Sequence, residues 1–270
     1  MSRLQENLDG GNLAEAISEG IAAVKANPTD SDLRYQLFAV LSFGGELHRA
    51  RKQLAALDVG DPELAAVQGV YINLLASEQE RLAVFHHGAE PLLPADPPQH
   101  LQLRLQALAA AHKGDHAAAD ELLATAIGVQ PELTGAINGE PMTAVRDLDD
   151  LLGSQLEVFA GGRYLWLPFE RIAELELDEP RHLLDLLWLP AQLTDRQGET
   201  SRVHIPVLYE DSWNSEDLRA ATGRITEWYC PGGEHERGRG QRLLGWGTAV
   251  GEMADIPLLE LRTLTLQPEK

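Results

Sequence analysis

The chain has 270 residues, of which 44% are hydrophobic and 24% are charged, as is typical of a globular protein. Its 42 acidic residues outnumber its 22 lysines and arginines, so the formal net charge is −20. A field of this sign repels phosphate backbones and anionic lipids, which argues against nucleic acid and membrane partners. The acidity is compatible with a basic protein partner, but solubility alone is the simpler explanation.

The cysteine content and the N-terminal segment indicate the cellular compartment. The single cysteine, Cys230, excludes an intrachain disulfide and a cysteine-based zinc site. The segment Met1–Asp9 is polar and acidic, unlike the apolar core of a signal peptide. No apolar run approaches the ~20 residues that span a bilayer. We therefore expect a cytoplasmic protein, and no motif indicates a cofactor.

The first half of the chain repeats itself. Three kinds of landmark recur at an offset of 34 residues and again after a further 69, about twice that period: Gly11, Gly45 and Gly114; Ala16, Ala50 and Ala119; Pro28, Pro62 and Pro131. This spacing is typical of tetratricopeptide helix pairs. The glycine allows a sharp turn between two helices, the alanine allows them to cross closely, and the proline ends or opens a helix.

One unit of this repeat is degenerate. Ala65–Ala76 is a plausible first helix, but Gln79–Glu90 lacks the small crossing residue and leads into four prolines ending at Pro98. We predict a distorted second helix followed by an extended connector. The first domain, 1–133, is accordingly predicted to be a TPR-like α-α superhelix.

Stacked helix pairs present a concave surface lined by the first helix of each pair. A groove with aromatic and aliphatic side chains beside an arginine suits an amphipathic helix or an extended peptide. The alternative is that some of these side chains pack against the second half of the chain. In the repeat register the groove candidates are Tyr35, Ala39, Ser42, Phe43, Asn73, Arg104, Leu108 and His112.

The second half changes period after a turn-rich joint at residues 135–141. A helix is predicted over Asp147–Phe159, because its leucines fall on one side. Alternation predicts strands at Arg163–Leu167 and Ile172–Leu177, and four further segments are also predicted to be strands: Leu183–Leu193, Arg202–Leu208, Arg224–Tyr229 and Leu258–Leu266. The expected domain, 134–270, has a small antiparallel or mixed sheet, one helix and an aromatic core. Together the two domains predict a multi-domain α+β fold.

Metal sites are not indicated by the histidines. His112 and His116 are separated by the predicted turn, and His86 and His87 point apart on a helix. His235 lies near Cys230 but lacks further ligands in its vicinity. We therefore expect no metal, because no ligand set is complete.

The densest carboxylate group is formed by Asp147, Asp149 and Asp150. It could hold a divalent metal or serve acid–base chemistry, but capping of the first turn of the predicted helix is favoured. No nucleophile elbow, phosphate loop or dinucleotide fingerprint is present. The glycine-rich stretch 232–247, with Arg237, could meet an acidic partner, although a mobile hairpin loop is favoured. We therefore expect no enzyme.

Several segments of the second half occur in a distinctive order. They are RDLDDLLG (Arg146–Gly153), GGRYLWLPFERI (Gly161–Ile172), LLDLLWLPAQLT (Leu183–Thr194), GRITEW (Gly223–Trp228), GRGQRLL (Gly238–Leu244) and LLELRTL (Leu258–Leu264). Together they resemble the ImpE, SciE or TagJ family, accessory proteins of bacterial type VI secretion clusters. The resemblance covers nearly all of Arg146–Leu266, and the family also has a TPR-like N-terminal region.

The resemblance implies a cytosolic accessory protein without enzymatic activity. Such a protein binds the small subunit of the contractile sheath, through a helical segment of that subunit, and works alongside the sheath-recycling ATPase. Two alternatives remain open at this point. One is a metal-dependent hydrolase that uses Asp147, Asp149 and Asp150 with His182 or His204, and the other is a structural scaffold joining two other proteins.

Overall fold

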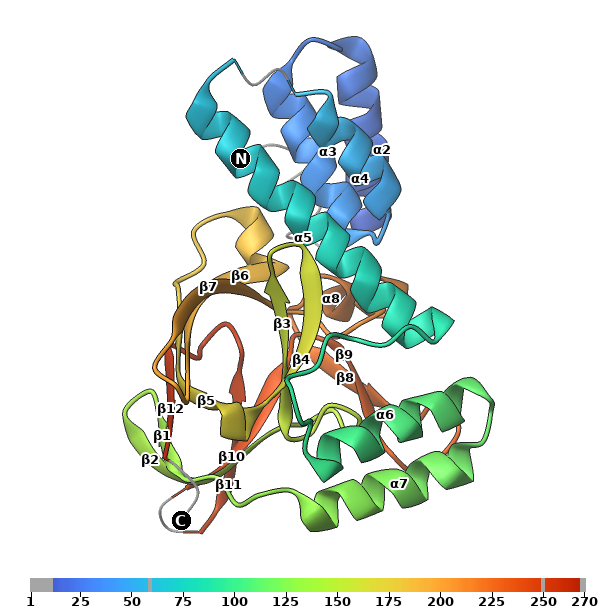
Figure 1. The fold of residues 1–270 in the computed structure, drawn as a ribbon. Helices are drawn as coiled ribbons and strands as arrows, with labels where there is room; N and C mark the ends of the chain where they lie inside the picture. The colour runs from blue at the N-terminus through green and yellow to red at the C-terminus, as the bar shows by residue number, and fades with distance from the viewer. Residues whose placement is uncertain (1–11, 58–59, 249–250, 268–270) are drawn as a thin grey trace.

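The computed structural model describes residues 12–57, 60–248 and 251–267, with helices in the first half and strands in the second (Figure 1). The predicted landmark Gly11 lies outside these residues. The helices of the first half are α2 (Leu13–Ala26), α3 (Ser31–Phe43), α4 (Leu47–Ala55), α5 (Pro62–His87), α6 (Gln99–His112) and α7 (His116–Val129).

The helix ends follow local sequence signals. Three aspartates cap helices by accepting from a backbone N–H in the first turn: Asp30 for α3, Asp61 for α5 and Asp115 for α7. Gly45 and Gly114, predicted as turn residues, adopt the left-handed conformation with φ of 67° and 77°. Because side chains disfavour this conformation, the two glycines let the chain reverse between α3 and α4 and between α6 and α7.

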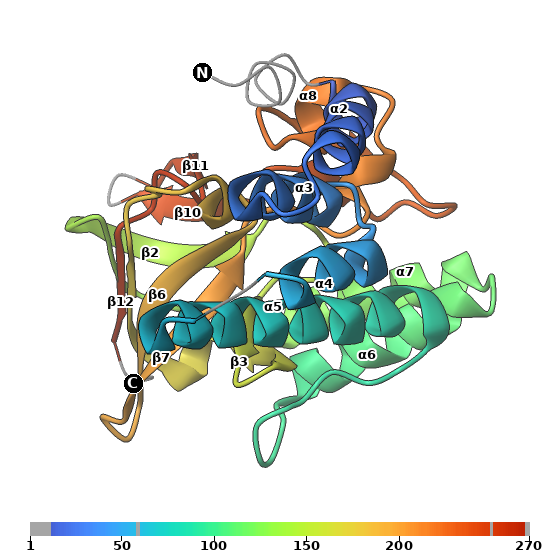
Figure 2. The same ribbon diagram turned by 90° about the horizontal axis from the view of Figure 1, so that it is seen from above.

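The predicted superhelix is not confirmed, because α5 is one continuous helix of 26 residues. The predicted break between Ala76 and Gln79 is wrong. Ser77, Glu78 and Arg81 of this continuous helix are buried on the face of α5 that meets the sheet. Seen from above, α5 runs across the sheet with α2 to α4 at its side (Figure 2). The pair α6 and α7 lies apart from α2 to α4, at the other end of the molecule (Figure 1).

The connector after α5 is extended, as predicted, and has a structural role. It covers the edge of the sheet at β4 (Arg163–Pro168), where Leu92 exchanges backbone hydrogen bonds of 2.9 and 3.0 Å with Tyr164 and Trp166. An edge strand with free N–H and C=O groups invites pairing with another chain. The connector therefore protects this edge.

The second half forms a ten-stranded curled sheet in the order β11-β10-β2-β1-β12-β5-β6-β7-β3-β4, in which every neighbouring pair is antiparallel (Figure 1). A separate hairpin pairs β8 with β9. The remaining strands are β1 (Gly135–Ile137), β2 (Glu140–Asp147), β3 (Gln155–Ala160), β5 (Ile172–Leu177), β6 (Trp188–Asp195), β7 (Thr200–Pro206), β8 (Thr226–Tyr229), β9 (Arg237–Gly240), β10 (Leu243–Thr248), β11 (Met253–Pro257) and β12 (Thr263–Leu266). Short helices are η1 (Phe169–Arg171), η2 (Leu183–Leu186), η3 (Ser212–Asn214) and α8 (Leu218–Ala221).

The predicted strands are confirmed best where residues alternate, at β4 and β5. The predicted strand Leu183–Leu193 begins with η2, and Leu258–Leu266 is a strand only in its last four residues. The predicted helix Asp147–Phe159 is wrong, since this stretch contains the end of β2, a turn and β3. β3 is buried along five consecutive residues, two of which are the polar Gln155 and Glu157, so its burial on both faces could not be predicted from a hydrophobicity pattern.

A buried carboxylate joins α5 to the sheet. Glu157 on β3 is fully buried and accepts hydrogen bonds of 2.7 and 3.0 Å from Arg81 of α5. The same carboxylate pairs with Arg242 and accepts from the Tyr164 hydroxyl. Burial alone would raise the pKa of Glu157, but Arg81 and Arg242 outweigh it and lower that pKa to about 2. The adjacent Glu78 accepts from the Trp188 indole of β6 at 3.0 Å, which adds a second link.

Replacing Glu157 with Gln should destabilise the fold strongly. The substitution leaves the buried guanidinium groups of Arg81 and Arg242 without their shared counter-charge, which costs about 3–5 kcal/mol. Urea denaturation at neutral pH measures the loss. Asp178→Asn, which breaks an exposed ion pair with Arg202, is the control and should cost less than about 1 kcal/mol.

The stability contribution of Glu157 should depend on pH. Because its folded pKa lies below its ordinary value of 4.5, the contribution is complete above pH 4.5 and is lost as the pH falls towards 2. The difference in unfolding free energy between wild type and Glu157→Gln should therefore shrink by about 1 kcal/mol between pH 6 and pH 3.5. Urea titrations of both proteins at the two pH values measure it, and a constant difference would contradict the assignment.

Candidate protein-interaction site

The eight predicted groove residues do not form one surface. Five of them are packed inside the protein: Ala39, Ser42, Phe43, Arg104 and Leu108. The prediction that these five line an open groove is corrected, because α3 and α6 are covered on the faces that carry them. Phe43 shares small cavities with Leu186 and Trp188 of the second half. For these side chains, packing against the second half of the chain was the predicted alternative to partner binding.

Arg104 illustrates this packing. Its guanidinium donates to the backbone carbonyls of Asp150 and Leu151 and to the Gln130 side chain at 3.2 Å. Burial and the nearby charge of Arg146 lower the pKa of Arg104 to about 10. The residue thus joins α6 to the turn that follows β2 and is not available to a partner.

The other three predicted residues reach the surface in separate places. His112 contacts the Phe85 carbonyl at 2.7 Å and ties α6 to α5. Asn73 is exposed on α5 and lies close to Gly162 in the β3–β4 turn. Tyr35 is half-buried on α3 and lines an apolar cavity between the helices.

This cavity, which we call the α3–α5 groove, has a volume of about 220 Å³. Its lining comes from α3, from α4 and the turn after it, and from α5: Ser31, Asp32, Tyr35, Leu54, Leu57, Leu64, Val67, Gln68 and Tyr71. The hydroxyls of Tyr35 and Tyr71 lie 3.2 Å apart, and their rings meet edge to face. Burial and this hydrogen bond raise the pKa of Tyr71, so the phenol stays neutral.

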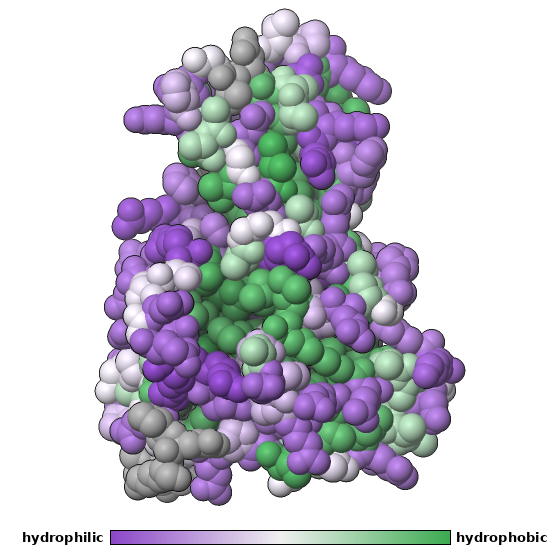
Figure 3. Space-filling view, viewed as in Figure 1, coloured by the Kyte–Doolittle hydropathy of each residue, from purple (hydrophilic) through white to green (hydrophobic). Residues whose placement is uncertain are grey.

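An apolar stripe on α5 extends the groove. Leu64 and Val67 are 56% and 51% exposed, and Val70 follows at the same three-residue spacing. Hydrophobic residues gather in a narrow strip among the helices at this end of the molecule (Figure 3). The three-residue spacing of this stripe is visible in the sequence. The groove prediction nevertheless included only Asn73 from this helix, because the repeat register placed Asn73 on the concave side. An exposed apolar stripe beside an aromatic pair is suited to docking another helix.

The carboxylate cluster is neutralised by arginines. Asp147 and Asp149 are fully buried and pair with Arg242 and Arg237, while Asp150 pairs with Arg146 at 2.7 Å. Burial raises the pKa of Asp147 to about 6, against the opposing charge of Arg242. The predicted helix-capping role is wrong because no helix begins here.

The aspartates instead hold the turn after β2. Asp149 accepts from the backbone N–H of Leu151 and of Gly238, both at 3.0 Å, and so joins this turn to β9. The rival catalytic partners lie in other elements: His182 precedes η2, and His204 pairs with Phe159 within the sheet. The arrangement is that of a structural network.

The remaining predictions about charged loops are also corrected. The stretch around Arg237 and Arg242 is not a mobile loop, because both arginines are buried in ion pairs. His235 pairs with Asp120 of α7 and does not join Cys230. Within the described part of the chain, one group of potential metal ligands comes together: His86, Glu210 and Asp211 lie within 4.8 Å of one another.

Arginines already stand beside that group. Arg237 lies 3.6 Å from Glu210, and Arg239 lies 3.7 Å from Asp211. These cations partly neutralise the two carboxylates, so the cluster has less need of a metal ion.

Comparison with known proteins identifies the family to which this chain belongs. The family model described as "ImpE protein" matches residues 139–265. A curated relative, the type VI secretion system accessory component TagJ of Pseudomonas aeruginosa (strain PAO1), is 33% identical over 264 residues, covering 98% of this chain and 91% of the relative. The chain belongs to the ImpE family. The resemblance predicted from the ordered segments is thereby confirmed.

A solved structure shares the ImpE-family fold described here. The crystal structure of protein VPA1032 from Vibrio parahaemolyticus superposes with a TM-score of 0.88 at 25% identity, covering 99% of this chain and 98% of that one. The likeness therefore includes both the helices and the sheet. Of the helices described in this chain, none is long and apolar enough to cross a membrane.

Substitution of Phe43 should distinguish a core residue from a groove residue. Phe43→Ala leaves a cavity between α3 and the second half and should cost about 3–5 kcal/mol of unfolding free energy. Leu64→Ala, at an exposed groove position, should change stability by no more than about 0.5 kcal/mol. Urea denaturation measures both changes in unfolding free energy. Equal small changes for the two variants would indicate that Phe43 is not a core residue.

Proposed function

We propose that this protein is an accessory component of a bacterial type VI secretion system and that it acts in the cytoplasm without catalysing a reaction. Membership of the ImpE family and the match to TagJ over 98% of the chain support the proposal. The carboxylates that suggested a hydrolase are paired with arginines, so they are poorly suited to hold a catalytic metal. The hydrolase is therefore not favoured.

The proposed partner is a helical segment of the small contractile-sheath subunit, bound in the α3–α5 groove. The observation that carries this choice is the exposed stripe of Leu64, Val67 and Val70 beside the paired Tyr35 and Tyr71. A docked amphipathic helix would remove these apolar side chains from water, at about 25 cal/mol for each Å² buried. The protein is further proposed to work alongside the sheath-recycling ATPase.

Charge near the groove suggests the character of the bound helix. Asp32 lines the groove, and Asp61 and Glu63 lie at the start of α5. Together with the net charge of −20, they favour a partner with basic residues flanking its apolar face and disfavour nucleic acid and membranes.

The division into domains 1–133 and 134–270 forms part of the proposal. The family match begins at residue 139, close to the proposed boundary, which supports it. In this scheme the helical part supplies the groove, and the sheet orients it through α5.

Calorimetry with a synthetic peptide of the N-terminal helix of the small sheath subunit tests the proposal. Wild-type protein should bind the peptide, and Val67→Glu should weaken binding at least about tenfold, or 1.4 kcal/mol, because a charge replaces an apolar contact. Tyr35→Ala should also weaken it. Ile127→Glu, at a site on α7 with 42% exposure, is the matched control and should bind like wild type.

Two results would contradict the proposal. Absence of binding at high micromolar peptide would remove the sheath subunit as partner. Binding that Val67→Glu and Tyr35→Ala leave unchanged would keep the partner and move its site away from the groove.

A further inference from the structure

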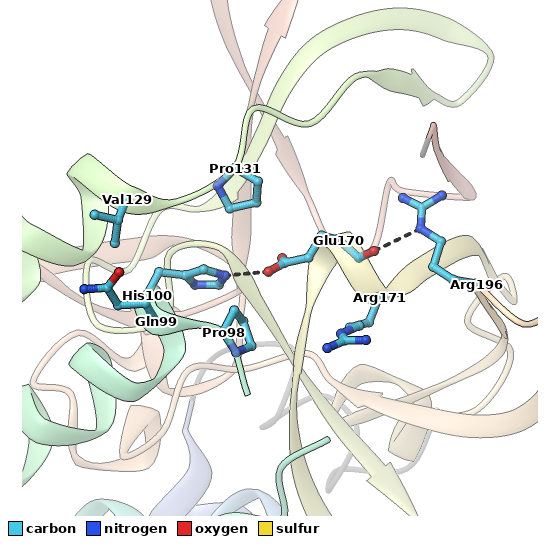
Figure 4. A pocket seen from close by; sticks show the side chains of 8 residues that line it. All are labelled: Pro98, Gln99, His100, Val129, Pro131, Glu170, Arg171 and Arg196. Atoms are coloured by element: carbon cyan, nitrogen blue, oxygen red, sulfur yellow. Dashed lines mark hydrogen bonds and ion pairs between the residues drawn. The ribbon is translucent and has the colours of Figure 1, made fainter. Parts of the chain in front are cut away.

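A second cavity lies at the other end of the molecule, where α6 begins and α7 ends. Its volume is about 640 Å³, enough for a small organic ligand. Four separate parts of the chain contribute its lining (Figure 4): Pro98, Gln99 and His100; Val129 and Pro131; Glu170 and Arg171; and Arg196. Glu170 and Arg171 belong to one of the segments that carry the family resemblance.

The polar wall of this pocket contains a buried histidine and a partly buried glutamate, each with an unused hydrogen-bonding atom. His100 is only 2% exposed, and its Nε2 lies 2.6 Å from Oε1 of Glu170, as Figure 4 shows. Because an ionised carboxylate only accepts, Nε2 carries the proton, and Nδ1 of a neutral ring is an acceptor. Nδ1 of His100 and Oε2 of Glu170 have no hydrogen-bond partner within the described part of the chain. Oε2 of Glu170 therefore requires a donor, and Nδ1 of His100 requires one when the ring is neutral.

Two arginines, Arg171 and Arg196, line the pocket and differ in their hydrogen bonds. Arg196 donates to the carbonyls of Glu170, Leu266 and Gln267 at 2.9, 2.7 and 2.9 Å, so its guanidinium is used to hold the backbone. Among the described residues, the Arg171 side chain makes one hydrogen bond, to the Asp96 carbonyl at 3.2 Å. The rest of its planar guanidinium is available at the pocket, with its side chain turned towards Pro98 (Figure 4).

The remaining wall is apolar. Pro131 and Pro98 lie on opposite sides of the His100–Glu170 pair, and Val129 lies near Gln99 (Figure 4). A ligand that fits this arrangement has an anionic group for Arg171, an N–H donor for Glu170 and His100, and a small apolar part for the prolines.

We propose that this pocket binds an amino-acid unit with a free carboxylate. The carboxylate pairs with the Arg171 guanidinium, which matches the planar geometry of a carboxylate with two parallel hydrogen bonds. The adjacent amino or amide N–H donates to Oε2 of Glu170 or Nδ1 of His100, and the side chain lies on Pro98, Val129 and Pro131. A free amino acid and the carboxyl-terminal residue of a peptide share this chemistry.

Calorimetry with four probes tests the proposal and separates its two sources. The probes are free L-alanine, free L-leucine, an acetylated tripeptide that ends in leucine with a free carboxylate, and the same tripeptide amidated at its end. At least one probe with a free carboxylate should bind. If the tripeptide binds, the amidated form should bind at least about tenfold more weakly. Binding of the free amino acids alone would identify a metabolite-sized ligand.

Variants assign the binding to Arg171. Arg171→Met should weaken binding of the best probe at least about tenfold, and Arg171→Lys should give an intermediate loss, since lysine keeps the charge without the planar fork. Arg202→Met is the matched control, because this exposed arginine of β7 pairs with Asp178 outside the pocket, and it should bind like wild type. Circular dichroism verifies that the variants are folded.

Three results would overturn the inference. They are the absence of binding by all four probes at millimolar concentration, equal binding of the amidated and free tripeptides, and binding that Arg171→Met leaves unchanged. None of them bears on the sheath-subunit peptide, which is proposed to bind at the α3–α5 groove.

Discussion

The structure depends on a single buried carboxylate held by two arginines from different parts of the chain. Glu157 of β3 lies between Arg81 of α5 and Arg242, which precedes β10. A buried charge is tolerated only when it is paired and its remaining hydrogen bonds are made. The Tyr164 hydroxyl completes this shell. The position of α5 on the sheet is therefore set by polar geometry as well as by apolar contact.

This attachment explains why the two ends of α5 differ. Its C-terminal half turns Ser77, Glu78 and Arg81 to the sheet, whereas its N-terminal half projects beyond the sheet towards α3 and α4 (Figure 1). The exposed Leu64 and Val67 belong to that projecting half. Because α5 is continuous, the α3–α5 groove is presented rigidly with respect to the sheet, which suits an adaptor that positions a bound helix.

Charge is distributed in two ways in this ImpE-family protein. Inside, Arg81, Arg237 and Arg242 are used to neutralise aspartates and glutamates, so the family segment at Arg146–Gly153 is a structural network. Outside, most of the net charge of −20 remains on the surface. The pocket at Arg171 has two arginines and one glutamate in its lining. The helices at whose ends it lies, α6 and α7, are at the other end of the molecule from α3 and α4, which line the α3–α5 groove (Figure 1). The two proposed sites can therefore be occupied independently.

The sequence by itself determined the features that depend on neighbouring residues. Gly45 and Gly114 mark turns because their conformation is local, and β4 and β5 alternate because each has one face on the core. The ordered family segments were likewise readable without coordinates, and the family match confirmed them. Tertiary structure alone decided that α5 is continuous and that Asp147, Asp149 and Phe43 are interior. The physical reason is that the partners of these residues are distant along the chain. Arg81 can be buried because it pairs with Glu157, which is 76 residues away in the sequence, and Glu78 because it accepts from Trp188, which is 110 residues away. Polar residues with distant partners look like surface residues in a sequence, and folding alone brings their partners to them.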